Sequence, residues 1–176
     1  LFKCIIDILE EEKKNYVLCA PTGRAAKRIT QTTGKEAKTL HRLLEISKID
    51  DHDIDMFFEY QVKPVEDEVV IVDEASMIDL MMMNNLVKGI KPSTQIIIVG
   101  DVNQLPSVGP GSVLKDIISS DVVPTVELKQ IYRQSAKSDI IVNAHRVNDG
   151  EYPEFKSKGT DLFFIPTKTI EDTVSE

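Results

Sequence analysis

Four short apolar runs, separated by stretches with helical periodicity, constrain the fold of this chain more than any other feature of its sequence. Each run is rich in β-branched residues and lacks the apolar–polar alternation of a strand that faces water on one side. Strands that alternate with helices imply right-handed crossover connections. The sequence therefore predicts a three-layer α/β domain with a mainly parallel sheet, whose strands are Tyr16–Ala20, Val69–Val72, Gln95–Val99 and Val123–Leu128.

Capping residues and helical periodicity predict the helices between these strands. Thr22 is a suitable N-cap for a helix that extends to about Thr33, and Gly34 is a suitable stop. Two segments depart from the pattern: the acidic segment Ile46–Glu68 is interpreted as an inserted hairpin, and Asp161–Ile165 as the first strand of a further unit. The other predicted helices are Phe2–Glu12, Asp79–Val87, Gly111–Ser119 and Ser138–Asn148.

The composition fits a soluble globular protein with a core of its own. The chain has 176 residues, of which 41% are hydrophobic and 28% charged. These values exclude wholesale disorder, a collagen and a disulfide scaffold. No apolar run approaches the ~18 residues of a membrane span. Cys4 and Cys19 lie in apolar settings without metal-ligand spacing, which predicts two buried thiols in a reduced, cytoplasmic protein.

Charge is distributed unevenly along the chain. The formal net charge of −8 argues, taken globally, against a nucleic-acid partner. The segment Pro21–Arg42 nevertheless has six basic residues against the single acidic residue Glu36, so its local charge is +5 and the remainder has −13. Because salt screens charges beyond about 8–10 Å, a phosphate responds to the local field. The basic segment therefore favours nucleic-acid binding.

Two adjacent carboxylates follow the most apolar of the predicted strands. Asp73 and Glu74 come directly after Val69–Val72, and ligands of open α/β sheets bind at the carboxyl ends of the strands. In P-loop NTPases an Asp at this position holds Mg²⁺, and a neighbouring Glu can orient and deprotonate the attacking water. The alternative is a strand that ends in a solvated acidic turn.

Two further strands lead into segments with polar side chains. Gly100 permits close backbone approach after the third strand, and Asp101 and Gln104 follow it. Glutamine is a neutral group that can sense a γ-phosphate or position a water molecule. Arg133 follows the fourth strand, where a guanidinium can stabilise charge on a transferred phosphoryl group. The alternatives are an ordinary turn with a surface Gln, and a solubilising Arg.

The basic segment contains two candidate phosphate contacts. Free amides and the dipole at a helix N-terminus favour an anion, and His41 could pair with phosphate or stack on a base. The alternatives are a capped helix and a His packed on an amphipathic helix. The candidate DNA-binding residues are Pro21, Thr22, Gly23, Arg24, Lys27, Thr39, His41 and Arg42.

A nucleotide-binding phosphate loop of the Gly-x-x-x-x-Gly-Lys-Ser/Thr type does not occur in the 176 residues. Thr33–Glu36 resembles it only in part, because Glu36 replaces the hydroxyl residue that Mg²⁺ requires. Such a loop precedes a helix, and this chain begins inside one. We therefore expect the loop upstream of Leu1, and we expect the chain alone to be inactive as an ATPase.

The motifs together resemble superfamily-1 DNA helicases of the RecD type, which include the exodeoxyribonuclease V alpha chain. The segments that support this resemblance are Ala20–Arg28, Thr39–Leu44, Val72–Met77, Gly100–Gly111, Tyr132–Gln134 and Ala144–Gly150. The resemblance implies a RecA-like three-layer P-loop NTPase fold, truncated at both ends. It assigns residues 1–150 to a first motor domain, and residues 151–176 to a linker and the beginning of a second.

The resemblance also implies the roles of individual residues. Asp73 would bind Mg²⁺, Glu74 would activate water, Gln104 would couple nucleotide state to DNA, and Arg133 would act as an arginine finger. Asp101 would join the nucleotide site, and residues 46–68 would form a pin at the duplex junction. Pro21–Arg24 would be motif Ia, and Thr39–Arg42 the next DNA-contacting motif.

The whole protein implied is an ATP- and Mg²⁺-dependent helicase that moves 5′ to 3′ on single-stranded DNA in recombination and repair. It would act alone or with other exodeoxyribonuclease V subunits, and no membrane is involved. Three alternatives remain: a non-catalytic single-stranded DNA-binding or assembly module, an RNA-directed or conjugative-transfer helicase of the same superfamily, and a generic α/β nucleotide-binding domain with fortuitous basic charge.

Overall fold

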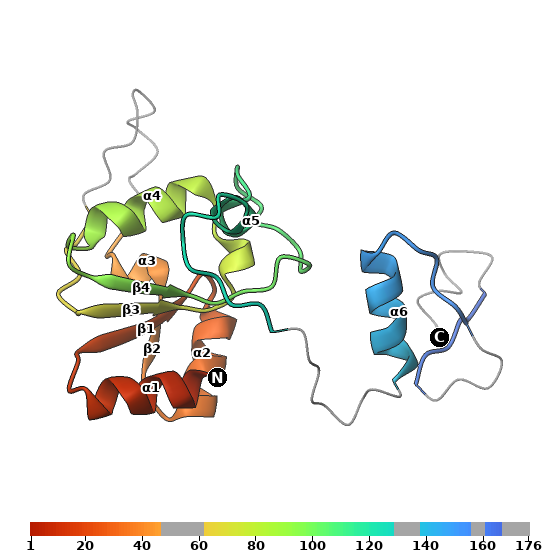
Figure 1. The fold of residues 1–176 in the computed structure, drawn as a ribbon, viewed down its shortest axis with the longest axis horizontal. Coiled ribbons are helices and arrows are strands. Elements are labelled where there is room, and N and C mark those ends of the chain that lie inside the picture. Colours follow the sequence, from red (N-terminus) through yellow and green to blue (C-terminus); the bar gives the residue numbers. More distant parts are fainter. Residues whose placement is uncertain (47–61, 129–137, 156–160, 167–176) are drawn as a thin grey trace. The chain divides into compact units, whose positions relative to one another are not determined.

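The computed structural model describes residues 1–46, 62–128, 138–155 and 161–166, which form two compact units, Leu1–Thr125 and Val126–Glu176 (Figure 1). The first unit contains a sheet of four parallel strands in the order β2-β1-β3-β4. This arrangement confirms the predicted parallel sheet. The strands are β1 (Tyr16–Ala20), β2 (Ala37–Thr39), β3 (Val69–Val72) and β4 (Gln95–Ile98).

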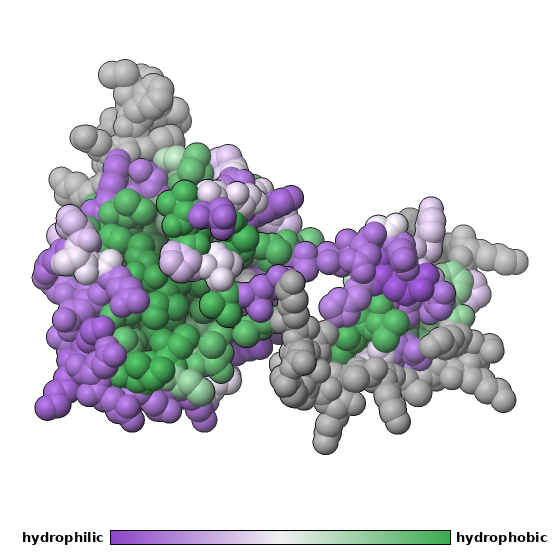
Figure 2. Space-filling view, in the orientation of Figure 1, coloured by the Kyte–Doolittle hydropathy of each residue, from purple (hydrophilic) through white to green (hydrophobic). Residues whose placement is uncertain are grey.

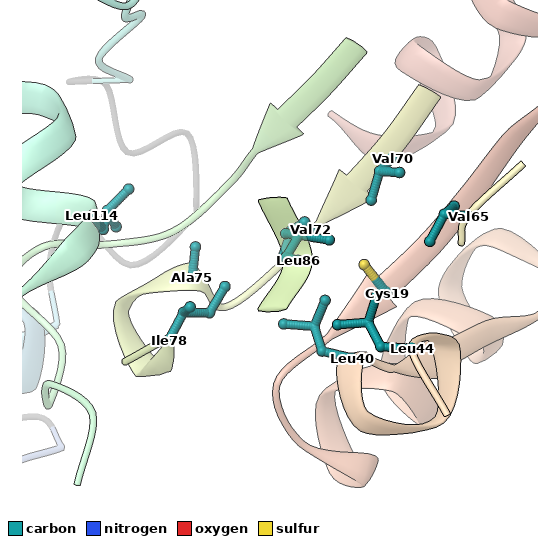
Figure 3. Packing of buried hydrophobic residues seen from close by; sticks show 10 residues of the cluster. All are labelled: Cys19, Leu40, Leu44, Val65, Val70, Val72, Ala75, Ile78, Leu86 and Leu114. Atoms are coloured by element: carbon teal, nitrogen blue, oxygen red, sulfur yellow. The ribbon is translucent and has the colours of Figure 1, made fainter. Parts of the chain in front are cut away.

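Helices cover both faces of this sheet, which confirms the three-layer prediction (Figure 1). Alternate residues of β1 and β3 point to opposite faces, so Leu18 and Ile71 pack under α1 and α2, whereas Cys19 and Val72 pack on the other side. Figure 3 shows the second cluster, to which Leu40, Leu86 and Leu114 contribute from three different helices. The helices of this unit are α1 (Phe2–Glu11), α2 (Gly23–Thr33), α3 (Leu40–Leu43), α4 (Leu80–Gly89), α5 (Val113–Ser119) and the 3₁₀ turn η1 (Ala75–Met77).

The helix ends lie where their capping residues predict. Thr22 Oγ1 accepts a hydrogen bond from Ala25 N at 3.2 Å, which satisfies one of the free amides of α2. Gly34 ends α2 in the left-handed conformation with φ +74°, a conformation that glycine adopts without steric cost. Asp79 caps α4 by accepting from Met82 N at 2.7 Å. These local contacts fix where each helix leaves the carboxyl end of a strand.

The fourth predicted strand, Val123–Leu128, is wrong. Residues 123–128 have no regular secondary structure, and all six are exposed. A strand requires hydrogen-bonding partners for its backbone, and within the described residues β4 pairs only with β3. β4 is therefore the last described strand on its side of the sheet, and its residues 96–98 are only half-buried. Figure 2 shows an apolar area on the face of this unit between α4 and α1.

The two cysteines differ in their surroundings. Cys4 is exposed on α1, which corrects the prediction that both thiols are buried, because the apolar positions around it turn away on the other side of the helix. Cys19 is buried in β1, and its thiol donates to Ile71 O at 3.4 Å. Burial raises the pKa of the Cys19 thiol to about 12, because a thiolate is poorly solvated there.

The second unit contains one described helix, α6 (Asp139–Asn148), with Ser138 as its N-cap. The predicted strand at Asp161–Ile165 is wrong: residues 161–166 have no strand, and the Asp161 carboxylate accepts from Asp139 N at 2.8 Å. Asp161 therefore closes the N-terminus of α6 from 22 residues away. The buried Asn143 side chain donates to Glu154 O at 3.1 Å and ties the following segment to the same helix.

The described chain on the two sides of residues 47–61 comes together, because Lys63 N donates to Leu44 O at 3.0 Å. Residues 47–61 lie outside the described residues, so the hairpin and its role as a pin stay predictions. The predicted boundary between motor domains at residue 150 also stays a prediction, and α6 belongs to the second compact unit. In the part of the chain that the structure describes, no helix is long and apolar enough to cross a membrane.

Candidate functional site

The carboxyl ends of the four parallel strands lie at one edge of the sheet (Figure 1). The registers Ala20↔Thr39, Cys19↔Val72 and Val72↔Ile98 align these ends within one residue. Because neighbouring strands lie about 4.8 Å apart, the segments that follow them are neighbours as well. We call this rim the carboxyl edge, and its order is residues 40–42, residues 21–24, residues 73–74 and residues 100–104.

The half of the carboxyl edge after β2 and β1 is basic and exposed. We call it the basic half; its exposed side chains are Arg24, Lys27, His41 and Arg42. Thr22 and Thr39 cap the two helices that begin there, and Thr39 Oγ1 accepts from Arg42 N at 3.2 Å. A hydroxyl that accepts from an amide still has its own hydrogen to donate. The free amides, the hydroxyls and the cations together suit a phosphate chain.

The other half, after β3 and β4, bears the acidic pair and is called the acidic half. Asp73 N donates to Cys19 O at 3.0 Å, so the ladder between β1 and β3 continues to the first carboxylate. Glu74 has left-handed backbone angles, φ +53° and ψ +39°, which cost a non-glycine residue on the order of 1 kcal/mol. Its carboxylate, 22% exposed, lies 3.4 Å from Arg28 Nη1 of α2.

The segment after β4 packs tightly on the turn that holds Glu74. Ala75 N donates to Val99 O at 3.0 Å, and a Cβ on Gly100 would lie 3.0 Å from Ala75 N and 3.1 Å from Ser76 N. Any side chain at position 100 would therefore crowd these two amides, which favours glycine there. Beyond it, Asp101 Oδ1 accepts from Asn103 N at 2.9 Å and forms an Asx turn.

Gln104 extends from that Asx turn into solvent. Its backbone N donates to Asp101 O at 3.2 Å, and its side chain is exposed. The loop returns to the domain where Leu80 N donates to Pro110 O at 2.9 Å, and where Gly109 packs against the Asp79 carboxylate. Gln104 is thus held at the carboxyl edge by a loop that is fastened at both of its ends.

The donor set of the acidic half fits a nucleotide-bound Mg²⁺ rather than a metal held by protein alone. Among the described residues, no three His, Cys, Asp or Glu side chains form a group that could hold a metal ion. Mg²⁺ commonly takes one or two carboxylates and completes its shell with water and substrate phosphates. The half-buried Asp73 at the end of β3 offers a carboxylate of that kind.

The structure brings most of the predicted site residues to one edge. Arg133 lies outside the described residues, so its position stays a prediction. Arg28, which contacts Glu74, was not among the predicted site residues, although its spacing of four residues from Arg24 places both on one face of α2. A shallow pocket of about 310 Å³ lies at the opposite ends of the strands, beside Tyr16 and Asp67, and does not contribute to this edge.

Comparisons with known proteins identify relatives of this chain. The AAA domain family matches residues 1–161. The chain is 36% identical, over 91% of its length, to the ATP-dependent RecD2 DNA helicase of Deinococcus radiodurans, and 32% identical, over 76%, to the RecBCD enzyme subunit RecD of Mycolicibacterium smegmatis. It spans only 21% and 27% of the lengths of these two relatives.

Solved helicase structures have a similar fold. A crystal structure of Bacteroides Pif1 bound to single-stranded DNA matches 82% of this chain and 39% of its own chain, with a TM-score of 0.50 and 26% identity. A Pif1 structure determined to explain DNA unwinding at forked duplexes matches 85% of this chain and 42% of its own, with a TM-score of 0.53 and 25% identity.

Proposed function

The chain belongs to the AAA domain family, as a segment of a RecD-type superfamily-1 helicase, and from this premise we propose that it forms part of an ATP-driven motor on single-stranded DNA. One observation supports the proposal most: the basic half and the acidic half lie on a single edge of one sheet. A motor must couple the binding of the DNA backbone to the hydrolysis of ATP. This edge of the sheet provides neighbouring positions for the two sites.

We assign the acidic half to ATP. Asp73 would hold the Mg²⁺ of the nucleotide, and Mg²⁺ when bound neutralises charge on the phosphate oxygens. Glu74 accepts a proton from the attacking water, because a carboxylate within reach of that water is a general base. Gln104 contacts the γ-phosphate region from the loop after β4, and Asp101 shapes that loop through its Asx turn. Arg133, whose position stays a prediction, would supply a cation to the phosphoryl group during its transfer.

We assign the basic half to the phosphates of single-stranded DNA. Arg24, Lys27 and Arg42 provide cations, and His41 provides a ring that can stack on a base. Thr22 and Thr39 provide hydroxyl donors beside the helix amides that they cap. Pro21 precedes the cap of α2 and Gly23 is the first residue of that helix, so a phosphate could approach the first amides of α2 at this point.

ATP hydrolysis in the full-length protein tests the proposal. We expect oligo-dT to stimulate steady-state hydrolysis, and we expect Glu74→Gln to lower it by about 10²–10⁴-fold while a fluorescent ATP analogue still binds. Hydrolysis that persists in Glu74→Gln would refute the assignment of the base. Because the phosphate loop is not among the 176 residues, the isolated chain should show no turnover.

Direction and assembly extend the proposal. A motor that moves 5′ to 3′ should displace streptavidin from a biotin at the 3′ end of an oligonucleotide, in an ATP-dependent manner, and leave a 5′ biotin occupied. Displacement from the 5′ end instead would reverse the assignment of direction.

Assembly with other subunits is a separate question. A subunit role in an exodeoxyribonuclease V complex predicts co-purification with the other subunits, and a stand-alone motor predicts activity without them.

A further inference from the structure

An ion pair connects the two halves of the carboxyl edge. Arg28 Nη1 lies 3.4 Å from Glu74 Oε1, and the side chains are 66% and 22% exposed. Arg28 belongs to α2, the helix that begins after the carboxyl end of β1, whereas Glu74 follows β3. The pair therefore joins the helix assigned to DNA to the carboxylate assigned to water activation, across 46 residues of sequence.

We propose that Arg28 is a positioning residue that restrains Glu74 until single-stranded DNA engages Arg28. In the free protein the Arg28 guanidinium pairs with one carboxylate oxygen of Glu74, and that oxygen is then unavailable to the attacking water. A DNA phosphate competes for Arg28 and releases the carboxylate. This inference rests on the proposed function, and it gives a physical route by which DNA would stimulate ATP hydrolysis.

The placement of Arg28 on α2 makes this competition feasible. Residues four apart on a helix are neighbours, with Cβ atoms about 6 Å apart, so Arg28 lies one turn beyond Arg24 on the same face of α2. A guanidinium binds phosphate and carboxylate through the same planar fork of donors. The exposed head of Arg28 can therefore turn from one to the other without movement of the helix.

The backbone of Glu74 favours a switch in the side chain rather than in the turn. Its left-handed conformation is followed by hydrogen bonds from Ala75 N to Val99 O and from Met77 N to Glu74 O, at 3.0 Å and 3.1 Å. The main chain on the far side of Glu74 is thus held, and the freedom lies in its side chain and in Arg28. Breaking the ion pair would therefore change the direction of the Glu74 carboxylate without a change in the backbone after β3.

Linkage gives a test that does not depend on catalysis. If Glu74 and DNA compete for Arg28, removal of the Glu74 charge must strengthen DNA binding, and removal of Arg28 must abolish that gain. We expect Glu74→Gln in the full-length protein to bind fluorescein-labelled oligo-dT about two- to fivefold more tightly without nucleotide, the range that an exposed ion pair supplies. In an Arg28→Gln background, Glu74→Gln should leave affinity unchanged.

The double-mutant cycle separates this effect from general electrostatics. A gain in affinity that persists in the Arg28→Gln background would show that Glu74 only repels DNA, and would overturn the inference. Unchanged affinity in the single variant Glu74→Gln would overturn it as well. If the wild-type protein binds no oligo-dT at all, the proposed function fails first, and the inference fails with it.

Kinetics of the full-length protein provide the second readout. Arg28→Gln should raise ATP hydrolysis without DNA by about two- to fivefold and leave turnover at saturating oligo-dT unchanged, so the stimulation factor falls. Arg28→Lys should lie between wild type and Arg28→Gln, because lysine keeps the charge without the fork. Lys88→Gln, an exposed charge loss on α4, should change neither rate. An equal fall in both rates for Arg28→Gln would indicate a merely structural role and contradict the proposal.

Discussion

The two halves of the carboxyl edge are built by different means. In the basic half, two threonines with ordinary extended backbone angles cap two helices, and the cationic side chains are exposed to solvent. In the acidic half, Glu74 has a left-handed backbone and Gly100 lies against the amides of the same turn. The basic half is held by local capping, whereas the acidic half depends on strain and close approach between two strands.

This difference indicates where the fold has been constrained for chemistry. A phosphate chain is bound by charge and free amides, which tolerate small displacements. A general base must lie within hydrogen-bond reach of a single water molecule, so small displacements matter greatly. Backbone strain held in place by surrounding structure is a common feature of such sites. The acidic half should therefore respond more sharply than the basic half to small changes in its backbone.

The largest effect on stability is expected for Gly100→Ala. The new Cβ would lie 3.0 Å from Ala75 N and 2.8 Å from Leu114 Cδ2, and overpacking of this kind costs about 1–3 kcal/mol. Gly23→Ala is the matched control in the basic half, because nothing lies within 4 Å of its Cβ position. Chemical unfolding of the full-length protein should show a loss for the first variant and almost none for the second; equal losses would remove the contrast.

A smaller effect is expected for Thr22→Ala. Loss of the bond from Ala25 N leaves an amide of α2 unsatisfied, which costs about 1 kcal/mol. Hydrogen exchange of the peptide that covers α2 should increase, while exchange around Glu74 stays as in wild type. Thr22→Ser keeps the acceptor and should restore protection. Faster exchange in both peptides would show that the two halves are not independent.

Strain at Glu74 can be measured by a comparison of two substitutions. Glu74→Gly and Glu74→Ala both remove the ion pair with Arg28, but only glycine adopts φ +53° without steric cost. Glu74→Gly should therefore be more stable than Glu74→Ala by about 1 kcal/mol. The usual order, in which alanine is the more stable of the two, would show that this turn relaxes and holds no strain.

The smallest effect concerns the boundary between the halves, where Cys19 lies on β1. Thiolate is the reactive form, and burial raises the pKa of Cys19 to about 12, so only a small fraction is ionised at pH 8. Mapping of iodoacetamide adducts at pH 8 should find Cys4 labelled and Cys19 protected until the protein is unfolded. Early labelling of Cys19 would show that the junction of β1 and β3 opens readily.

Sequence patterns predicted the elements that are held by local signals or by complete burial. The apolar runs at β1 and β3, the cap at Thr22 and the stop at Gly34 lie where they were expected. Strand β2 was missed because Ala37–Thr39 is short and polar, and exists through its pairing with β1. Val123–Leu128 was wrongly predicted for the converse reason, since apolar character does not supply a neighbouring strand.

For the site, residue types could be predicted but their connections could not. The spacing of motifs indicated Asp73, Gln104 and the basic residues, and parallel topology brings the strand ends to one edge. The pair between Arg28 and Glu74 depends on side-chain directions across two elements, which no periodicity encodes. The same limit applies to Asp161, whose carboxylate caps a helix 22 residues earlier in the chain.

The most direct test of the central claim is an oligo-dT titration of ATP hydrolysis in the full-length protein, with Arg24→Ala and Glu74→Gln compared side by side. If the basic half binds DNA and the acidic half hydrolyses ATP, Arg24→Ala should raise the DNA concentration for half-maximal stimulation and leave the plateau rate unchanged. Glu74→Gln should abolish ATP hydrolysis at saturating DNA without weakening DNA binding. A loss of plateau rate in Arg24→Ala, together with weaker DNA binding in Glu74→Gln, would contradict the division.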